Sequence, residues 1–118
     1  MTRMWMTDVS QMCRQHLLGE HKEIHQLMGS LKKKMNLNGY VEKNCIEISS
    51  IISRHQTLVD EMIRRGYNHH SPIEPMLEFE QIIEYLPDHI RNFKIDKESS
   101  KIELLQRCTH CRANSIQK

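Results

Sequence analysis

The chain has 118 residues, of which 38% are hydrophobic and 27% are charged, and its formal net charge is +2. This length suits a single domain, and the composition is that of an ordinary globular protein. No apolar run approaches the roughly 20 residues of a membrane-spanning helix, and the charged N-terminus lacks a signal peptide's apolar core. We therefore expect a cytoplasmic protein. The small net charge does not by itself indicate a nucleic-acid partner.

The first segment of the chain, residues 1–7, has no helical periodicity, so we expect an extended arm. Asp8 is a typical N-cap residue. Over residues 9–35 the apolar side chains recur at intervals of three and four, which predicts one amphipathic helix. Glu20 interrupts its apolar stripe. Because a buried carboxylate needs a partner, we expect Glu20 to pair with His16 or with an Arg from elsewhere in the chain.

The remainder of the chain predicts further helices and no strand pairs. Asn and Gly residues at 36–39 indicate a break. A second helix follows over about 44–65, and Gly66 is a typical residue directly after a helix end. A short helix is predicted over about 76–85 and a last helix over about 98–111, while the polar tail 112–118 is expected to fray. The sequence therefore predicts an all-α single domain of three main helices and one short helix.

The N-terminus offers a candidate nucleophile. If Met1 is removed, Thr2 carries a free α-amine with a pKa near 7.7–8, whereas a lysine amine has a pKa near 10.4. A free amine can attack an electrophilic sugar carbon and form an imine. Glu23 is the natural partner, because a carboxylate stabilises a developing sugar cation and can transfer protons. His16, Glu20 and Glu23 share one side of the helix and are expected to border one pocket.

Short sequence matches carry a resemblance to a known family. They are Met1-Thr2-Arg3, Gln15-His16-Leu17, the pair Glu20 and Glu23, and the later run Arg65-Gly66-Tyr67-Asn68. In these residues the chain resembles the phage endonuclease V family of pyrimidine-dimer DNA glycosylases and abasic-site lyases. The resemblance implies an all-α enzyme that bends DNA and flips a nucleotide. In such an enzyme the terminal amine attacks the sugar to release the base, and β-elimination then nicks the strand.

The resemblance also implies a role for each matching residue. Thr2 would be the nucleophile, and Glu23 would be the acid/base group and cation stabiliser. Arg3 would hold a phosphate or the glutamate, while Gln15 and His16 would line the lesion site. The full set of expected substrate or DNA contacts also includes residues chosen for their charge and position, and comprises Arg3, Gln15, His16, Glu20, Lys22, Gln26, Arg64, Arg65 and His69.

The positions at which the chain departs from the family affect the expected choice of lesion more than the expected reaction. Lys22 keeps the charge of a family arginine but loses its bidentate fork, and Gln26 loses the charge of another. The family's aromatic, basic C-terminal tail has no counterpart in residues 112–118. Three substrate classes therefore remain open. The enzyme acts on pyrimidine dimers, on another damaged base, or mainly on abasic sites. We expect a monomer that needs no cofactor and acts on damaged double-stranded DNA in the nucleoid or in a host cell.

Cysteine and histidine residues suggest a separate metal hypothesis. Cys108 and Cys111 form a Cys-x-x-Cys pair with His110 inside it, and four such ligands can hold Zn²⁺. Without a second cysteine pair at zinc spacing, the pattern favours packing for Cys108 and a helix-end role for Cys111. Cys13 and Cys45 are expected to pack as small apolar residues.

Other histidines have weaker patterns. His21 and His25 lie one turn apart on the first helix, while His55 falls inside the apolar stripe of the second and is expected to form a single hydrogen bond at the edge of the core.

An alternative function on the same fold is a non-catalytic DNA-binding or protein-interaction module, stabilised by zinc through Cys108 and Cys111. The two functions differ at the N-terminus. If Met1 stays in place, the amine is displaced by one residue and the imine chemistry should fail.

Overall fold

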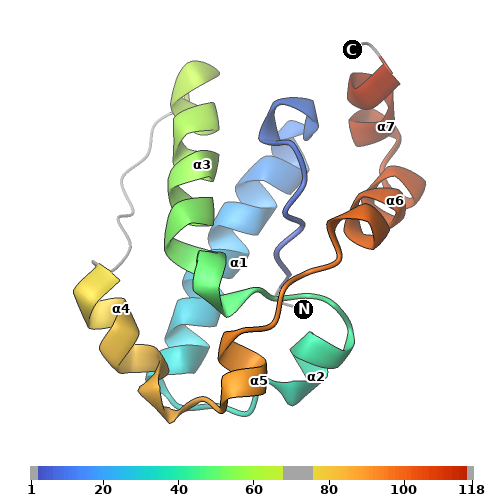
Figure 1. The fold of residues 1–118 in the computed structure, drawn as a ribbon. Coiled ribbons are helices and arrows are strands. Elements are labelled where there is room, and N and C mark those ends of the chain that lie inside the picture. Colours follow the sequence, from blue (N-terminus) through green and yellow to red (C-terminus); the bar gives the residue numbers. More distant parts are fainter. Residues whose placement is uncertain (1–2, 68–75, 117–118) are drawn as a thin grey trace.

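Two amphipathic helices lie against each other at the centre of the fold. They are α1 (Arg14–Lys32) and α3 (Ile51–Arg64), and Figure 1 shows them side by side. The computed structural model describes residues 3–67 and 76–116. Buried positions of both helices follow the three- and four-residue intervals of one helical face, including Leu17, Ile24 and Leu31 of α1 and Ile51, Leu58 and Met62 of α3. The apolar periodicity therefore identified the central helix pair.

The first helix begins later than its periodicity predicts. Residues Val9–Gln11 form a separate 3₁₀ turn, η1, and Asp8 caps that turn by accepting a hydrogen bond from the Ser10 amide at 2.9 Å. Met12 then adopts an extended conformation and is 1% exposed. Cys13 caps α1, with its Sγ accepting from the His16 amide at 3.5 Å. Burial of Met12 thus separates the turn from the helix.

The link from α1 to α3 differs from the predicted break. Residues Asn38–Glu42 form a short helix, α2, and positive φ angles occur at Lys34 and Asn44 rather than at Gly39. The buried run after Asn44 leads into a 3₁₀ turn, η2 (Ile48–Ser50), so α3 starts several residues later than predicted. A buried segment and the turn η2 therefore stand where the first turns of the helix were predicted.

The end of α3 follows the sequence expectation. Gly66 has φ +87°, the left-handed conformation that glycine adopts without strain. Its amide donates to the Ile63 carbonyl at 2.9 Å, and the Tyr67 amide donates to the Met62 carbonyl at 2.8 Å. This is the Schellman arrangement that satisfies the last carbonyls of a helix.

The C-terminal part is a series of shorter helices. They are α4 (Met76–Ile82) with the 3₁₀ turn η3 (Ile83–Tyr85), α5 (Asp88–Arg91), α6 (Lys97–Arg107) and α7 (Thr109–Ile116). The predicted short helix is present, whereas the predicted last helix is divided at Cys108, which is extended. The tail expected to fray is helical as far as Ile116. The break between α6 and α7 coincides with a long-range contact, since Cys108 Sγ lies 3.7 Å from Cys13 Sγ.

Residues from the N-terminal arm, the central helices and the C-terminal helices form one hydrophobic core. Alongside the α1 and α3 residues it contains Met4 and Trp5 of the N-terminal arm and Ile90, Ile95 and Leu104 of the C-terminal part. No strand occurs among residues 3–67 and 76–116, which confirms the all-α class. In the same residues no helix has both the length and the apolar character required to cross a membrane.

Candidate active site

One face of α1 forms the wall of an open pocket of ≈ 500 Å³. The arm supplies residues on one side and α6 supplies Arg107. The residues around the pocket are Arg3, Trp5, Gln15, His16, Gly19, Glu20, Lys22, Glu23, Gln26 and Arg107. Every first-helix residue that the sequence assigned to the site therefore lines this one pocket, and Arg3 of the arm lines it too.

Helical spacing explains this gathering on α1. Gln15, Gly19, Lys22 and Gln26 follow one another at intervals of three and four residues. Residues at these intervals lie on the same side of an α-helix. Sequence reasoning missed Trp5, Gly19 and Arg107. The position of the chain's single Trp beside Arg3 was an available signal for Trp5, whereas no local pattern marks Arg107.

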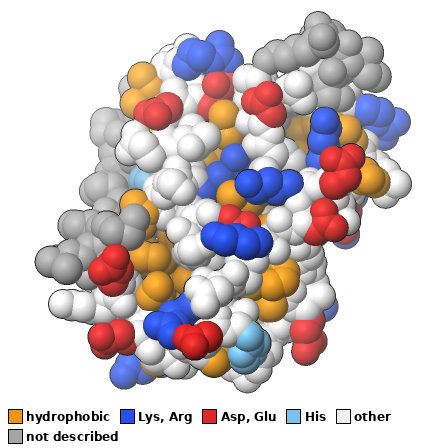
Figure 2. Space-filling model, viewed as in Figure 1, with side chains coloured by type: hydrophobic (Ala, Val, Ile, Leu, Met, Phe, Trp, Pro, Cys, Tyr) orange, Lys and Arg blue, Asp and Glu red, His pale blue; other side chains and the backbone are white. Residues whose placement is uncertain are grey.

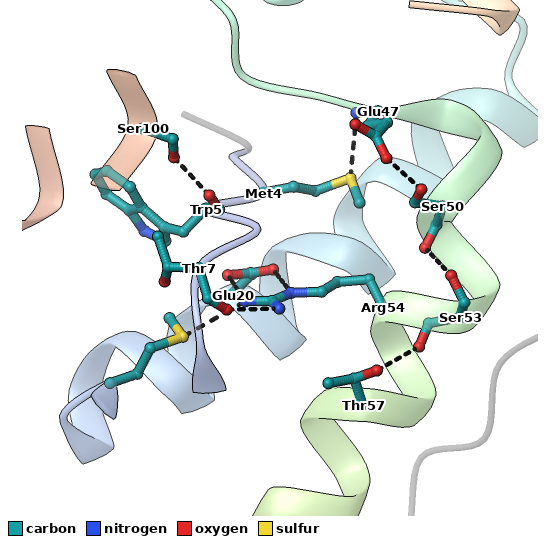
Figure 3. Close-up of polar contacts among 11 residues, drawn as sticks. Met4, Trp5, Thr7, Glu20, Glu47, Ser50, Ser53, Arg54, Thr57 and Ser100 are labelled. Atoms are coloured by element: carbon teal, nitrogen blue, oxygen red, sulfur yellow. Dashed lines mark hydrogen bonds and ion pairs between the residues drawn. The ribbon is translucent and has the colours of Figure 1, made fainter. Parts of the chain in front are cut away.

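Hydrogen bonds from other elements hold the arm along the pocket. The Met4 amide donates to the Cys45 carbonyl at 2.7 Å. Figure 3 shows the Trp5 carbonyl accepting from Ser100 Oγ, at 2.5 Å. An extended segment has no hydrogen bonds of its own to satisfy its backbone. The arm is therefore positioned by the rest of the fold.

A buried ion pair adds a third anchor for the arm (Figure 3). Arg54 of α3 donates from Nε and Nη2 to the Glu20 carboxylate at 2.5 and 3.0 Å, and from Nη1 to the Thr7 carbonyl at 2.9 Å. Glu20 is fully buried. The expectation that an Arg from elsewhere pairs with Glu20 is confirmed, and His16 is not its partner. Both Glu20 oxygens are used by Arg54, so this carboxylate supports the pocket wall.

Glu23 has a different environment one helical turn away. Its side chain is half-buried in the pocket wall. Burial raises its pKa above the ordinary value, the nearby Glu20 carboxylate adds to the rise, and Arg3 partly opposes it. A carboxyl group with a pKa moved toward neutrality exchanges protons more effectively near pH 7. Glu23 is thus the pocket carboxylate suited to acid/base chemistry.

Arg3 is held by a partner that the sequence did not indicate. Its guanidinium lies 4.1 Å from the centre of the Trp5 ring and forms an ion pair with Glu103 of α6. Arg107 Nη2 lies 3.2 Å from the same Glu103 carboxylate. The expected partners of Arg3 were a phosphate or Glu23, and in the structure its carboxylate partner is Glu103. Figure 2 shows one face of the molecule, on which basic and acidic side chains lie intermixed near the middle.

Two expected DNA contacts lie away from the pocket. Arg64 and Arg65 both pair with Glu61 on α3, which lowers the pKa of that carboxyl to about 2. Arg65 Nη2 also donates to the carbonyls of Val9 and Met12, at 2.9 and 2.7 Å. Arg65 therefore fastens η1 to α3, and its guanidinium already has protein partners.

Two other expected site residues, Thr2 and His69, lie outside the residues that the structure describes.

Two groups of potential metal ligands occur among the described residues. One contains Cys13, His16, Cys108 and Cys111, and the other contains His21, His25 and His55. The predicted candidate His110 is exposed and belongs to neither group, so that part of the metal hypothesis is wrong. Cys45 is buried in the core, as expected.

The histidine group explains the position of His55 within the stripe of α3. His55 Nε2 lies 3.2 Å from His25 Nε2. The two rings therefore meet between α1 and α3, and His55 is buried there.

Burial shifts the pKa of two members of the first group, His16 and Cys111. Burial lowers the pKa of His16, which favours the neutral imidazole. Burial raises the pKa of the Cys111 thiol to about 12, so this thiol keeps its proton at neutral pH unless a cation replaces it. Burial thus favours the neutral forms of the His16 imidazole and the Cys111 thiol.

Comparison with known proteins identifies one family. The family model of pyrimidine dimer DNA glycosylases matches residues 2–75, which is more than half of the chain. No curated protein and no solved structure matches the chain. The matched region contains the arm, α1 and α3, and it ends before α6, which supplies Arg107 to the pocket and Glu103 as the partner of Arg3.

Proposed function

Because the chain belongs to the pyrimidine dimer DNA glycosylase family, we propose that it repairs DNA by releasing a damaged base and then cleaving the strand. The α-amine of Thr2 is the nucleophile in this proposal, and Glu23 is the acid/base group. The substrate is double-stranded DNA that carries a pyrimidine dimer or a related damaged base.

The position of Arg3 relative to Glu23 is the observation that supports this chemistry most directly. Both residues line the same pocket. Hydrogen bonds at Met4, Trp5 and Thr7 hold the arm that carries Arg3. Thr2 directly precedes Arg3 in the sequence, and consecutive Cα atoms are about 3.8 Å apart. This sequence neighbourhood supports the choice of the residue 2 amine as the nucleophile that acts with the half-buried Glu23 carboxyl group.

The reaction proceeds in two steps. In the first, the Thr2 nitrogen forms a bond to C1′ of the deoxyribose, the glycosidic bond breaks, and its electron pair leaves with the base, which takes up a proton. Glu23 stabilises the positive charge that develops on the sugar. Opening of the sugar ring gives an imine between the amine and C1′.

In the second step, a base removes a proton from C2′, and the electron pair expels the 3′ phosphate. This elimination cuts the strand, and hydrolysis of the imine returns the amine. In this proposal Glu23 accepts and returns these protons.

The pocket also suits recognition of an extruded nucleotide. Its volume of ≈ 500 Å³ lies within the roughly 300–1,000 Å³ range of ligand pockets. Exposed side chains at its edge, Gln15, Lys22 and Gln26, can contact phosphate or base edges. A base enters such a pocket only after it leaves the helical stack. We assign these three residues to DNA contact.

Borohydride trapping tests the proposal. The protein is mixed with DNA that contains an abasic site, then with DNA that contains a thymine dimer, and borohydride reduces any imine to a stable amine. Mass spectrometry of the protein establishes whether Met1 has been removed and which residue carries the adduct. We expect an adduct on Thr2, and the DNA that traps more efficiently identifies the lesion class.

A matched pair of variants controls this experiment. Thr2→Ser keeps a small second residue and a free α-amine, so it should still form the adduct. Thr2→Glu has a large second residue that should retain Met1, so trapping should be lost. If protein shown to lack Met1 forms no adduct with either DNA, the imine mechanism is wrong, and a non-catalytic DNA-binding or protein-interaction module becomes the better account.

A further inference from the structure

Four side chains with metal-binding atoms converge where the start of α1 meets the junction of α6 and α7. They are Cys13, His16, Cys108 and Cys111, and their ligand atoms all lie within 4.8 Å of one another. We refer to them as the thiol–imidazole group. Cys13 Sγ lies 3.7 Å from Cys108 Sγ, although the two residues are 95 positions apart in the chain. The fold, rather than local sequence, therefore creates this group.

The distances match one tetrahedral ion. In a tetrahedral zinc site the Zn–S bonds are near 2.3 Å and the Zn–N bonds near 2.0–2.1 Å, so neighbouring sulfur atoms are about 3.8 Å apart and sulfur and nitrogen about 3.6 Å apart. Cys13 Sγ is 3.7 Å from Cys108 Sγ, and His16 Nδ1 is 3.2 Å from Cys13 Sγ and 3.9 Å from Cys111 Sγ. An iron–sulfur cluster distributes its thiolates over several iron atoms, and these sulfur atoms are too close together for that.

The backbone around the sulfur atoms is arranged to support thiolates. The Cys111 amide faces Cys108 Sγ at 3.4 Å, the Cys13 amide faces Cys111 Sγ at 3.2 Å, and the His16 amide faces Cys13 Sγ at 3.5 Å. Each sulfur thus accepts one N–H group. Such donors stabilise negative charge on a ligand atom and orient it toward a metal.

The spacing of the ligands also has the pattern of a zinc site. Cys13 and His16 form one pair separated by two residues, and Cys108 and Cys111 form another. Two short pairs from distant parts of a chain are the usual way in which proteins build structural zinc sites. Cys108 and Cys111 are 8% and 1% exposed, so the group is largely shielded from water.

We propose that the thiol–imidazole group binds one structural Zn²⁺ ion, which fastens α6 and α7 to the start of α1. Four protein ligands complete the tetrahedron and leave no position for a substrate, which is the mark of a structural site. The ion joins the part of the chain that matches the glycosylase family to the part that lies outside the match.

The ion would also stabilise the pocket. His16 lines the pocket, and Arg107, another lining residue, directly precedes the ligand Cys108. His16 faces the sulfur atoms through Nδ1. The ion would therefore fix the positions of two pocket residues without entering the reaction, and the proposal does not depend on the imine mechanism.

Metal analysis of the full chain tests the proposal. The untagged protein is produced in medium that contains Zn²⁺ and iron, gel-filtered, and analysed for both metals by plasma mass spectrometry. We expect about one zinc per chain and no stoichiometric iron. Replacement of the zinc by Co²⁺ should give the intense near-ultraviolet absorption of cobalt–thiolate bonds together with the visible bands of tetrahedral cobalt. Removal of the ion by a chelator should lower the melting temperature.

Variants locate the ion. Cys111→Ser should reduce the bound zinc to a small fraction of the wild-type value. His25→Gln, in the second histidine group, and Cys45→Ala, a buried cysteine outside the site, should leave the stoichiometry unchanged. If Cys111→Ser does not fold, the cobalt spectrum of the wild-type chain still decides whether thiolates bind the metal.

Three results would overturn the proposal. One is folded wild-type protein that retains no zinc after equilibration with Zn²⁺. Another is loss of the metal in His25→Gln with full occupancy in Cys111→Ser, which would place the ion in the second histidine group. The third is a thiol count that shows a disulfide between Cys13 and Cys108 in protein purified under reducing conditions.

Discussion

Glu20 and Glu23 show how surroundings give two identical side chains different roles. The two residues lie one turn apart on α1 and line the same pocket. Glu20 is fully buried and gives both oxygens to Arg54. Glu23 is half-buried, and burial raises its pKa. Because the Glu20 carboxylate is already paired, Glu23 is the one of the two that we propose as the acid/base group.

We expect Glu23→Gln to abolish base release while DNA binding survives. The amide keeps the size of the side chain but can neither accept a proton nor carry the negative charge that stabilises the sugar cation. General acid/base catalysis contributes about 10²–10⁴-fold, so the rate should fall at least that far. Base release and binding are measured on the same lesion-containing DNA, and Glu42→Gln on the exposed surface of α2 is the control. Unchanged turnover in Glu23→Gln would remove this residue from the mechanism.

At the scale of elements, Arg54 joins three parts of the molecule. Its guanidinium reaches Glu20 on α1 and the Thr7 carbonyl of the arm from its own position on α3. A buried ion pair contributes little net stability compared with apolar packing, but loss of one partner leaves an uncompensated charge. The positions of the arm and of α1 are therefore sensitive to this one side chain.

We expect Arg54→Met to lower the free energy of unfolding by about 3–5 kcal/mol, because it leaves the Glu20 carboxylate buried without a partner. Denaturant unfolding measures this change. The double variant Glu20→Gln with Arg54→Met removes the charge and should recover part of the loss. Arg64→Met is the matched control, because Arg64 is 62% exposed and should cost about 1 kcal/mol or less. Equal costs for Arg54→Met and Arg64→Met would contradict this account of the pair.

At the scale of the whole molecule, three basic side chains from different elements border one pocket, although the net charge is small. Arg3 of the arm, Lys22 of α1 and Arg107 of α6 lie around the same opening, while the formal net charge of the chain is only +2. Binding to a phosphate backbone depends on the local arrangement of charge more than on the total. The pocket face is thus where we expect DNA to bind.

The salt dependence of DNA binding tests this orientation. Each phosphate contact contributes about 0.9 to the slope of log K against log salt, so Lys22→Ala or Arg3→Ala should flatten the slope by about that amount. Lys22 is the cleaner test, because Arg3 also packs on Trp5. Arg91→Ala, on α5, should leave the slope unchanged, since Arg91 pairs with Asp88 and does not line the pocket. A slope that changes in Arg91→Ala but not in Lys22→Ala would place the DNA on another face.

The sequence by itself determined the features that depend on neighbouring residues. The apolar periodicities identified α1 and α3, Gly66 marked the end of α3, and helical spacing grouped His16, Glu20 and Glu23 around one pocket. Residue matches also indicated the family that the comparison then identified. These features could be predicted because periodicity, helix caps and short motifs involve interactions over only a few residues.

Only the tertiary structure decided the contacts between distant residues. Arg54 became the partner of Glu20, and Glu103 became the partner of Arg3. The meeting of Cys13 with Cys108 likewise had no local signal, and neither did the division of the last helix at Cys108. The chain contains several side chains that could form each of these contacts. Which of them does so depends on how whole helices pack against one another. Most side chains that line the pocket therefore come from one helix, while the contacts that hold them in position come from other parts of the fold.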